Sequence, residues 1–415
     1  MDNITHTIIG LVAGDSIARA GSATSPGLSA DTRRNWFVVI AAVGGNLPDL
    51  DLVLTYGGFG NDKLAYLLQH RGYTHTIVGC VVLSLLLYAA TELWARFRRL
   101  TLTRRDRFAL GAMALFATLL HLGMDSLNSY GVHPFWPFDN AWFYGDSVFI
   151  IEPLYWIAAA PMFFLVKSMV TRILVGLLLL VALAAHVFVH LGQPVWYIGI
   201  ILLTVALLAV GKRASARTAS LVSAATTVGI TAMFIFAGQA AAHRVEAIAA
   251  RDFPSETGID HVLSPSPTNP LCWDVLLLQS GSGRYIARHA MIANAPSWLA
   301  ADRCANLFEG QHSTAPMTEV QAPENPVVRW LGQFSMPENR LASLVAQNCE
   351  AFELMQFVRA PFAAEVDGRW VIGDLRFDRE VSLGMSEIAV GDPAHSQCRH
   401  HVPWVPPRAA LLRVE

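Results

Sequence analysis

Long apolar runs dominate residues 1–242 and are absent from residues 243–415, so the hydrophobic pattern divides the chain into two parts. A run of about 20 apolar residues is the length that an α-helix needs to cross the hydrocarbon core of a bilayer. The pattern therefore predicts membrane helices followed by a more polar tail. Four helices are clear and two more are expected: 75–95, 108–127, 171–191 and 218–241, then 148–166 and 194–210.

Two shorter apolar stretches, 4–19 and 36–47, predict short or tilted helices. The first carries Gly10 and Gly14, which lie four residues apart on one helix face. Small residues at this spacing allow the backbones of two membrane helices to approach closely.

The tail alternates strand-like segments with turns, which predicts an α+β fold. Residues 272–292 predict a hairpin that turns at a Ser-Gly-Ser-Gly segment, and residues 362–378 predict a second hairpin that turns at Asp367-Gly368. Between them, residues 337–357 have helical periodicity and begin with a proline, which is favoured near a helix N-terminus.

Composition supports this division. Of 415 residues, 53% are hydrophobic and 15% are charged, and the mean hydropathy is +0.40. This balance is more apolar than that of a soluble chain. We expect a polytopic α-helical membrane domain at 1–242, with about six long spans and two short N-terminal helices, and a soluble α+β domain at 243–415. A net charge of −2 gives no basic surface for nucleic acid.

The basic residues predict the orientation of the helices. Six arginines lie between residues 96 and 107, directly after the first long span. The positive-inside rule places this connection in the cytoplasm. If the two short helices also cross, alternating spans leave only Lys63 and Arg71 outside among the basic residues before residue 243. The chain is therefore expected in a bacterial inner membrane, with its C-terminal domain in the periplasm.

Four of the five cysteines, Cys272, Cys304, Cys349 and Cys398, lie in this tail. An even number of cysteines in one domain on the oxidising side of the membrane predicts two disulfides. Four cysteines allow three pairings, and the sequence does not choose among them.

Ionisable residues of the membrane half gather at the predicted outer ends of five segments. They are His6, Asp49, Asp51, His70, His75, His121, Asp125, Asp146 and Glu152. Ionisable groups at membrane depth are costly and mark functional sites. His121 and Asp125 share a helix face at i and i+4, and Asp49 and Asp51 point the same way if their segment is extended. Mixed histidine and aspartate ligands suit zinc, and also manganese or iron.

Each residue also has a plainer explanation. A single histidine at a helix end is more often an interfacial hydrogen-bonding group than a ligand. Asp49 could cap a turn after Pro48, and Asp146 could cap the next helix. Glu152 could extend to the interface. The aromatic loop 128–146 is expected at the headgroup level, with a lipid-facing pocket as the alternative. These single-residue explanations do not account for the gathering of all these ionisable residues at one level of the membrane.

At these residues the chain resembles the YdjM/YbcI-type inner-membrane proteins classed as metal-dependent hydrolases. The shared pieces are THTIIG, NLPDLD, HRGYTHT, HLGMDSLNSYG and YGDSVFIIEPLYW, in that order, with NPLCWDVLL and IGDLRFD in the tail. The spacing of His121 and Asp125 is also similar to the zinc sites of the phospholipase C group. One departure is visible, because Glu152-Pro153 stands where the family has Asp-Pro.

The resemblance implies a membrane-bound metal-dependent hydrolase. The expected metal ligands are His6, Asp49, Asp51, His70, His75, His121 and Asp125, with zinc favoured and manganese as the alternative. A metal-activated water would cleave an ester or phosphoester of a membrane lipid or lipid-linked substrate. Asp146 or Glu152 is the expected general base. Arg71 could steady the developing anion, although a headgroup contact explains it as well.

Two other functions remain open at this point. A transporter of metal ions or protons also places acids and histidines in the membrane, but it needs polar residues through the full depth of the bilayer. A non-enzymatic scaffold could use the metal as a structural clamp, which usually needs only four ligands.

Overall fold

The computed structural model describes the whole chain except for residues 22–27, 58–62, 189–193, 306–316, 324, 378–383, 392–397 and 413–415. Contacts divide the described residues into two compact units. Unit 1 contains Met1–Leu50, Tyr73–Asn128 and Val148–Ile235, and unit 2 contains Asp51–Gly72, Ser129–Ser147 and Phe236–Glu415. Two short segments of the apolar half therefore group with the tail. The predicted domain boundary after residue 242 stays a prediction.

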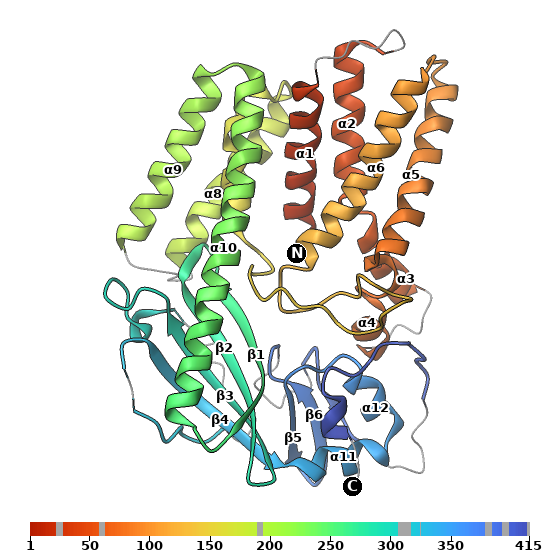
Figure 1. The fold of residues 1–415 in the computed structure, drawn as a ribbon. Coiled ribbons are helices and arrows are strands. Elements are labelled where there is room, and N and C mark those ends of the chain that lie inside the picture. The colour runs from red at the N-terminus through yellow and green to blue at the C-terminus, as the bar shows by residue number, and fades with distance from the viewer. Residues whose placement is uncertain are drawn as a thin grey trace. The chain divides into compact units, whose positions relative to one another are not determined.

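Unit 1 is helical (Figure 1). Its elements are α1 (Asn3–Ala20), α2 (Ala30–Gly44), α5 (Ile77–Phe97), α6 (Arg104–Asp125), α7 (Pro153–Ala158), α8 (Met169–Phe188), α9 (Pro194–Arg213) and the first part of α10 (Ala216–Asp252), with 3-10 turns η1 (Pro48–Leu50), η2 (Tyr73–His75) and η3 (Ala160–Leu165). The helices α1, α2, α5 and α6 lie side by side. The segment at Asp49 is a 3-10 turn rather than the extended chain considered above.

Four helices among the described residues are long and apolar enough to cross a membrane. They are α5, α6, α10 and the Trp196–Arg213 part of α9. The described apolar part of α8, Met169–Ala184, is shorter, and residues 189–191 of that predicted span lie outside the described residues. The count of six long spans is therefore not confirmed.

The predicted span 148–166 is wrong. Its helical part is the six-residue α7, followed by the 3-10 turn η3. Pro153 can occupy the first position of a helix, but Pro161 interrupts one, because proline lacks the N–H that an interior position must donate. Two prolines eight residues apart leave too little room for a membrane-length helix.

The close approach predicted at Gly10 and Gly14 is confirmed between α1 and α2. A Cβ atom on Gly10 would lie 2.6 Å from the carbonyl oxygen of Ala41, and one on Gly14 would lie 2.7 Å from that of Phe37. These neighbours are backbone atoms, so they cannot move away without shifting α2. The two glycines therefore set the distance between the first two helices.

The Gly10→Ala variant is expected to unfold more easily than the parent, because overpacking costs about 1–3 kcal/mol. Gly229→Ala in α10 is the matched control, since no atom lies within 4 Å of its missing Cβ and alanine favours a helix by up to about 1 kcal/mol. Thermal unfolding in detergent measures both. Equal melting temperatures for the two variants would contradict this account of the contact.

Unit 2 is built on two antiparallel sheets, in the strand orders β1-β2-β3-β4 and β5-β6-β7. Its strands are β1 (Thr257–Ser266), β2 (Asn269–Gly281), β3 (Arg284–Ala293), β4 (Val328–Pro337), β5 (Pro361–Val366), β6 (Arg369–Asp374) and β7 (Ile388–Ala389), and its shorter helices are α3 (Asp51–Gly57), α4 (Lys63–Gln69), α11 (Glu338–Ala346), α12 (Cys349–Met355) and the 3-10 turns η4 (Ala301–Arg303) and η6 (Ala409–Leu412).

Both predicted hairpins are confirmed. In the first, Cys272 pairs with Ala293 and Gly281 pairs with Arg284, and the turn residues have positive φ. The second turns at Asp367 and Gly368, with φ values of 50° and 73°. Positive φ at both central residues is what a tight hairpin turn requires. The helix predicted over 337–357 is divided into α11 and α12 at Asn348, which caps the second helix.

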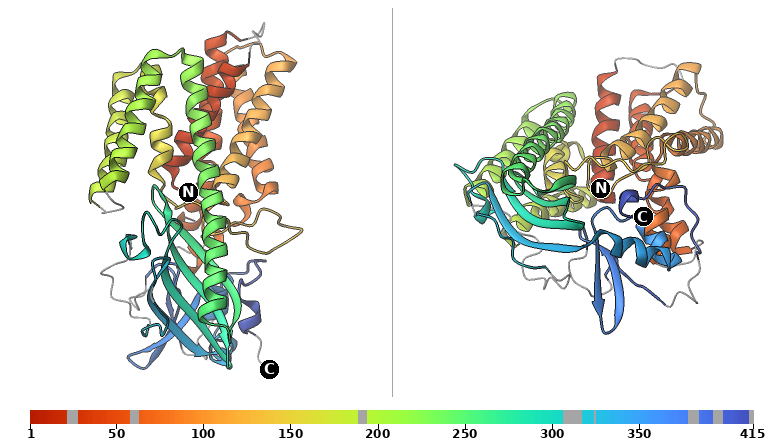
Figure 2. Two further views of the ribbon diagram at one scale, coloured as in Figure 1. Left: turned by 60° about the vertical axis from the view of Figure 1, so that its left-hand side comes forward. Right: turned by 60° about the horizontal axis from the view of Figure 1, so that its bottom comes forward.

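The four-stranded sheet buries both of its faces. Alternate residues of β2 point to opposite sides, so Val275 and Leu277 pack against Val245 and Ile248 of α10. Leu276 and Leu278 belong to the core on the other face, which α11 and α12 help to build. Figure 2 shows the C-terminal part of α10 lying along this sheet.

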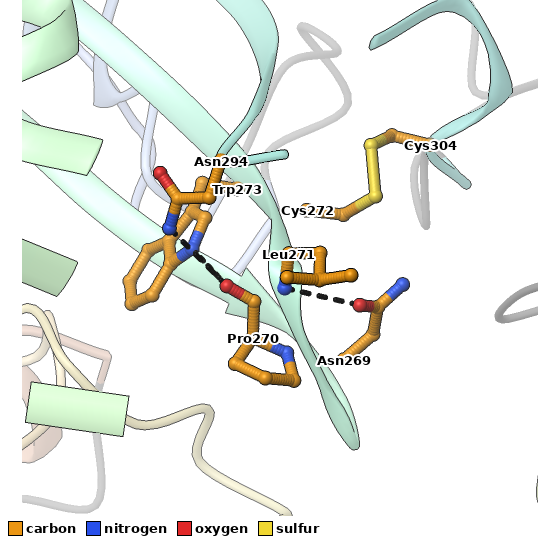
Figure 3. The surroundings of a disulfide bond; sticks show 7 residues. All are labelled: Asn269, Pro270, Leu271, Cys272, Trp273, Asn294 and Cys304. Atoms are coloured by element: carbon orange, nitrogen blue, oxygen red, sulfur yellow. Dashed lines mark hydrogen bonds between the residues drawn. A yellow bond between two sulfur atoms is a disulfide. The ribbon is translucent and has the colours of Figure 1, made fainter. Parts of the chain in front are cut away.

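Two cysteine pairs in unit 2 confirm the predicted disulfides. Cys272 pairs with Cys304 and Cys349 pairs with Cys398, with Cα atoms 5.6 and 5.0 Å apart. Figure 3 shows the first pair beside the buried Trp273, whose Nε1 donates a hydrogen bond of 2.9 Å to the carbonyl of Pro270. This pair ties the start of β2 to the residue that follows η4.

Candidate metal centre

Four side chains of unit 1 bring their donor atoms together where helices begin and end. Asp49 lies in η1, which follows α2, and His75 ends η2, just before Thr76 caps α5. His121 and Asp125 lie one turn apart at the end of α6 and face the same way. All four side chains are buried, with His75 and Asp125 fully inaccessible to solvent. The sequence prediction that these residues converge is confirmed for this group.

Five of the six distances among the four donor atoms lie close to the edge length of a tetrahedral metal site. His75 Nε2 lies 3.3 Å from Asp49 Oδ1 and 3.1 Å from Asp125 Oδ2. His121 Nε2 lies 3.6 Å from the same oxygen of Asp49 and 3.5 Å from the same oxygen of Asp125. The two Nε2 atoms are 3.0 Å apart. Atoms that bind a tetrahedral metal at about 2.0–2.1 Å are about 3.3 Å from one another, so the group can hold a metal ion.

The second donor atom of each side chain is bound elsewhere. Asp49 Oδ2 accepts a hydrogen bond of 2.8 Å from the Asn3 side chain. His121 Nδ1 lies 2.7 Å from the carbonyl oxygen of Gly45. His75 Nδ1 lies 3.0 Å from the Thr74 hydroxyl. Such outer contacts fix the orientation of metal ligands and leave one atom of each directed at the ion.

His6 acts on the other oxygen of Asp125. Its Nε2 lies 3.1 Å from Asp125 Oδ1, and the amino group of Met1 contacts the same oxygen. The His6 ring also stacks on the His121 ring, with centroids 3.9 Å apart. This geometry favours a role for His6 in holding Asp125 in place. Its predicted role as a direct ligand stays a prediction.

Asp51, His70 and Arg71 are buried together in unit 2. His70 Nδ1 lies 3.0 Å from Asp51 Oδ1, and the backbone N–H of Arg71 donates to Asp51 Oδ2 at 3.0 Å. The Arg71 guanidinium lies over the Tyr130 ring, 4.7 Å from its centroid, and only 2% of the residue is exposed. Burial of this depth counts against a contact with lipid headgroups. The roles predicted for these three residues stay predictions.

Asp146 is bound by an arginine of the tail. Arg359 donates to both of its carboxylate oxygens at 2.8 Å and also binds Asp260 at 2.8 Å. Burial alone would lower the pKa of Arg359. Asp146 and Asp260 outweigh this effect and raise the pKa, so the guanidinium stays charged. Both oxygens of Asp146 are therefore occupied by the Arg359 guanidinium, which counts against the predicted role of Asp146 as general base.

The charge of Asp260 predicts how stability depends on pH. Burial raises the pKa of Asp260, but Arg359 and Arg408 outweigh this and hold it below its usual value of 3.8. A depressed folded-state pKa contributes stability that is present above about pH 4 and is lost as the pH falls through the folded value. Unfolding of the tail should therefore become easier below pH 4, and Asp260→Asn should be less stable at pH 7 with a flatter pH profile. Parallel profiles for parent and variant would contradict this.

Glu152 caps α7 through Oε1, which accepts a hydrogen bond of 3.0 Å from the backbone N–H of Leu154. The residues around it contact the start of α1. The carbonyl of Ile150 accepts from the Asp2 backbone N–H at 3.1 Å, and Trp156 Nε1 donates to the Thr5 hydroxyl at 2.9 Å. Glu152 therefore lies in the part of unit 1 that carries His6.

Sequence reasoning missed the residues that orient the ligands. Asn3, Thr74 and the carbonyl of Gly45 have no chemistry that marks them in a single sequence. The spacing of Asn3 and His6, three residues apart on one face of α1, was the one available signal. Sequence reasoning also missed Arg359, which lies 213 residues from its partner Asp146.

Residues 1–197 match the model of a known family. That family is the YdjM inner membrane protein family, and the match covers just under half of the chain. This confirms the resemblance drawn from the motifs. The matched region contains all four residues of the metal-centre candidate, Asp49, His75, His121 and Asp125. The match ends before the tail, so the predicted resemblance of the tail stays a prediction.

One curated relative is the protein YfhP of Bacillus subtilis (strain 168). It is 31% identical over 144 residues, which are 34% of this chain and 39% of YfhP. The similarity therefore covers well under half of either protein. No solved structure matches the chain.

Proposed function

We propose that this protein is a metal-dependent hydrolase of the membrane, which cleaves an ester or phosphoester of a lipid-like substrate. The observation that carries the proposal is the set of four buried donors, Asp49, His75, His121 and Asp125, whose donor atoms all lie within 4.8 Å of one another and whose second atoms are separately anchored. Two carboxylates buried this closely are strongly unfavourable without a cation to compensate them. The motifs of the family support the same chemistry.

Zinc is the favoured ion and manganese the alternative, because two imidazoles and two carboxylates suit both. A bound ion of this kind would act as a Lewis acid and would lower the pKa of a bound water toward neutral pH. The chain itself orients the ligands through Asn3, Thr74 and the carbonyl of Gly45. His6 holds Asp125 in place through the oxygen that faces away from the other donors.

Glu152 is our choice of general base. It is a buried carboxylate of unit 1, and the residues on both sides of it contact the start of α1 near His6. The alternative, Asp146, is bound on both oxygens by Arg359. We further propose that the centre lies at the outer face of the inner membrane and that the tail is periplasmic. The basic residues after α5 and the two cysteine pairs support this orientation.

A structural metal clamp is the second candidate. Four protein ligands in a buried setting are also what a closed structural site uses. A transport pathway has less support, because the metal-ligand candidates of unit 1 lie at one end of its helices.

Glu152→Gln separates these functions, because glutamine keeps the shape of the side chain and loses the base. Metal-loaded parent protein is incubated with phospholipids that differ in headgroup, and released fatty acid, phosphate or phosphorylated headgroup is measured by mass spectrometry. We expect hydrolysis by the parent and a loss of about 10²–10⁴-fold in the variant at unchanged metal content. If the parent holds its metal but cleaves none of these phospholipids, the hydrolase is contradicted and the structural metal clamp is supported.

A further inference from the structure

The long helix α10 provides a measure of depth in the membrane. It runs without a break over Ala216–Asp252, and it is one of the helices that are long and apolar enough to cross a bilayer. No charged residue or histidine lies between Arg217 and His243 on this helix. The midpoint of that interval is Ile230, and half of a ~30 Å hydrocarbon core corresponds to about 10 residues of helix. An α10 that crosses the membrane therefore leaves the core near residue 240.

A turn of the tail is bound to α10 at this depth. The side chain of Asn294 donates a hydrogen bond of 2.8 Å to the carbonyl oxygen of Ala237, and Arg244 donates one of 2.8 Å to the carbonyl oxygen of Asn294. Ala237 and Arg244 lie on either side of residue 240, each about one helical turn from it. Asn294 is therefore fixed at the boundary between the hydrocarbon core and the headgroup layer.

The turn that follows Asn294 exposes a tryptophan. The backbone N–H groups of Trp298 and Leu299 both donate to the carbonyl oxygen of Ala295 at 2.9 Å. Leu299 is buried in a cluster that contains both cysteines of the first disulfide, whereas 86% of Trp298 is exposed. Residues 294–301 contain no charged side chain. An uncharged turn with a fixed backbone therefore presents an exposed indole ring near the boundary.

A second exposed aromatic segment ends at the same depth. The carbonyl oxygen of Asp146 and the hydroxyl of Ser147 lie 3.4 and 3.5 Å from the position that a Cβ atom on Gly238 of α10 would occupy. These residues close the aromatic loop, in which Phe135 and Phe138 are 54% and 91% exposed. Exposed large apolar side chains that gather in this way mark a contact with a partner or a membrane. Two segments of unit 2 that contact α10 near the end of its apolar stretch thus both carry exposed aromatic rings.

We propose that Trp298 inserts between the headgroups and the acyl chains of the bilayer and anchors the tail to the lipid surface. Tryptophan prefers this layer, because its ring is apolar while its indole N–H can still bind water or a headgroup oxygen. The uncharged turn enters the layer without desolvating a charge. Its fixed backbone loses little conformational freedom on insertion. The inference requires that α10 crosses the membrane, and it depends neither on the metal centre nor on the side of the membrane where the tail lies.

Depth measurements by electron paramagnetic resonance test the proposal in the full-length protein in phospholipid nanodiscs. A nitroxide label is attached at Ser297→Cys, which is exposed beside the tryptophan. Labels at Val228→Cys, an exposed position near the midpoint of α10, and at Arg251→Cys, in its last turn, mark the hydrocarbon core and the aqueous side. Cys80, the one cysteine outside the two pairs, is buried and out of reach of the label. The measured quantity is the accessibility of each label to oxygen, which concentrates in hydrocarbon, relative to a water-soluble nickel chelate.

We expect the ratio of oxygen to nickel accessibility at position 297 to exceed that at position 251 by about tenfold or more, because position 251 lies about 16 Å beyond the end of the core. Equal ratios at positions 297 and 251 would overturn the proposal. Poor accessibility of position 297 to both reagents would also overturn it, since protein would then cover the turn. High nickel accessibility at position 228 would remove the premise that α10 crosses the membrane, and the proposal with it.

Trp298→Ser in the labelled Ser297→Cys protein tests the ring itself. The ratio of oxygen to nickel accessibility at position 297 should fall by about threefold or more, because the turn loses the side chain that prefers the interfacial layer. Phe352→Ser is the matched control, since Phe352 is an exposed aromatic residue of α12 in the same unit. It should leave the ratio unchanged. A ratio that is the same with and without Trp298 would overturn its role as the anchor.

Discussion

Replacing His121 with alanine is expected to remove metal binding and hydrolysis together. His121 Nε2 is one of the four donor atoms, and its loss leaves two carboxylates and one imidazole. Loss of an outer contact costs about 10–100-fold in metal affinity, so loss of a ligand should cost at least about 100-fold. Competition with a chelating dye measures the affinity, and release of phospholipid products measures the activity.

His243→Ala is the control for this experiment, because His243 is an exposed histidine of α10 that pairs with Glu246 on the same helix. It should bind metal as the parent does. Circular dichroism should show unchanged helix content for His121→Ala if the ion is catalytic. A variant that keeps the metal would contradict the site, and one that loses the metal and unfolds would support the structural clamp.

Arg359→Met is expected to destabilise unit 2 more than other substitutions in the tail. The guanidinium binds Asp146 and Asp260 at once, and its removal leaves both carboxylates partly buried without a partner from this residue. Breaking a buried ion pair on one side costs about 3–5 kcal/mol. At about 2–4 °C per kcal/mol for a domain of this size, the melting temperature should fall by roughly 6–20 °C. Hydrogen exchange in β1 and β5 should rise with it.

Arg369→Met is the matched control, because this arginine is exposed at the start of β6. It should change the melting temperature little. The double variant Arg359→Met/Asp146→Leu should recover part of the lost stability, since one of the two carboxylates that Arg359 no longer pairs with is then absent. A single variant as stable as Arg369→Met would show that the ion pairs contribute nothing measurable to the fold.

Local signals predicted much of this fold. The two hairpins follow from turn residues that tolerate positive φ, at Gly283 and at Asp367-Gly368. The contact of α1 with α2 follows from two glycines on one face. The failure at 148–166 has an equally local cause, because hydropathy outweighed two prolines in that prediction. Composition alone cannot tell a buried irregular segment from a membrane span.

The candidate site could be predicted only as a set of chemically apt residues. Histidine and aspartate at helix ends identified Asp49, His75, His121 and Asp125, because their chemistry is rare at membrane depth. Which of the remaining candidates join them depends on distances that no sequence pattern carries. The partner of Asp146 lies more than two hundred residues away, so its ion pair could not be foreseen.

Metal content of the purified parent protein tests the central claim most directly. The protein in detergent is incubated with zinc or manganese, passed through gel filtration, and analysed by inductively coupled plasma mass spectrometry. The four donors predict at least one tightly held ion per chain, and X-ray absorption should then show imidazole nitrogens about 2.0–2.1 Å from zinc. A parent that folds and retains no ion after either incubation would contradict the metal centre and the hydrolase mechanism with it.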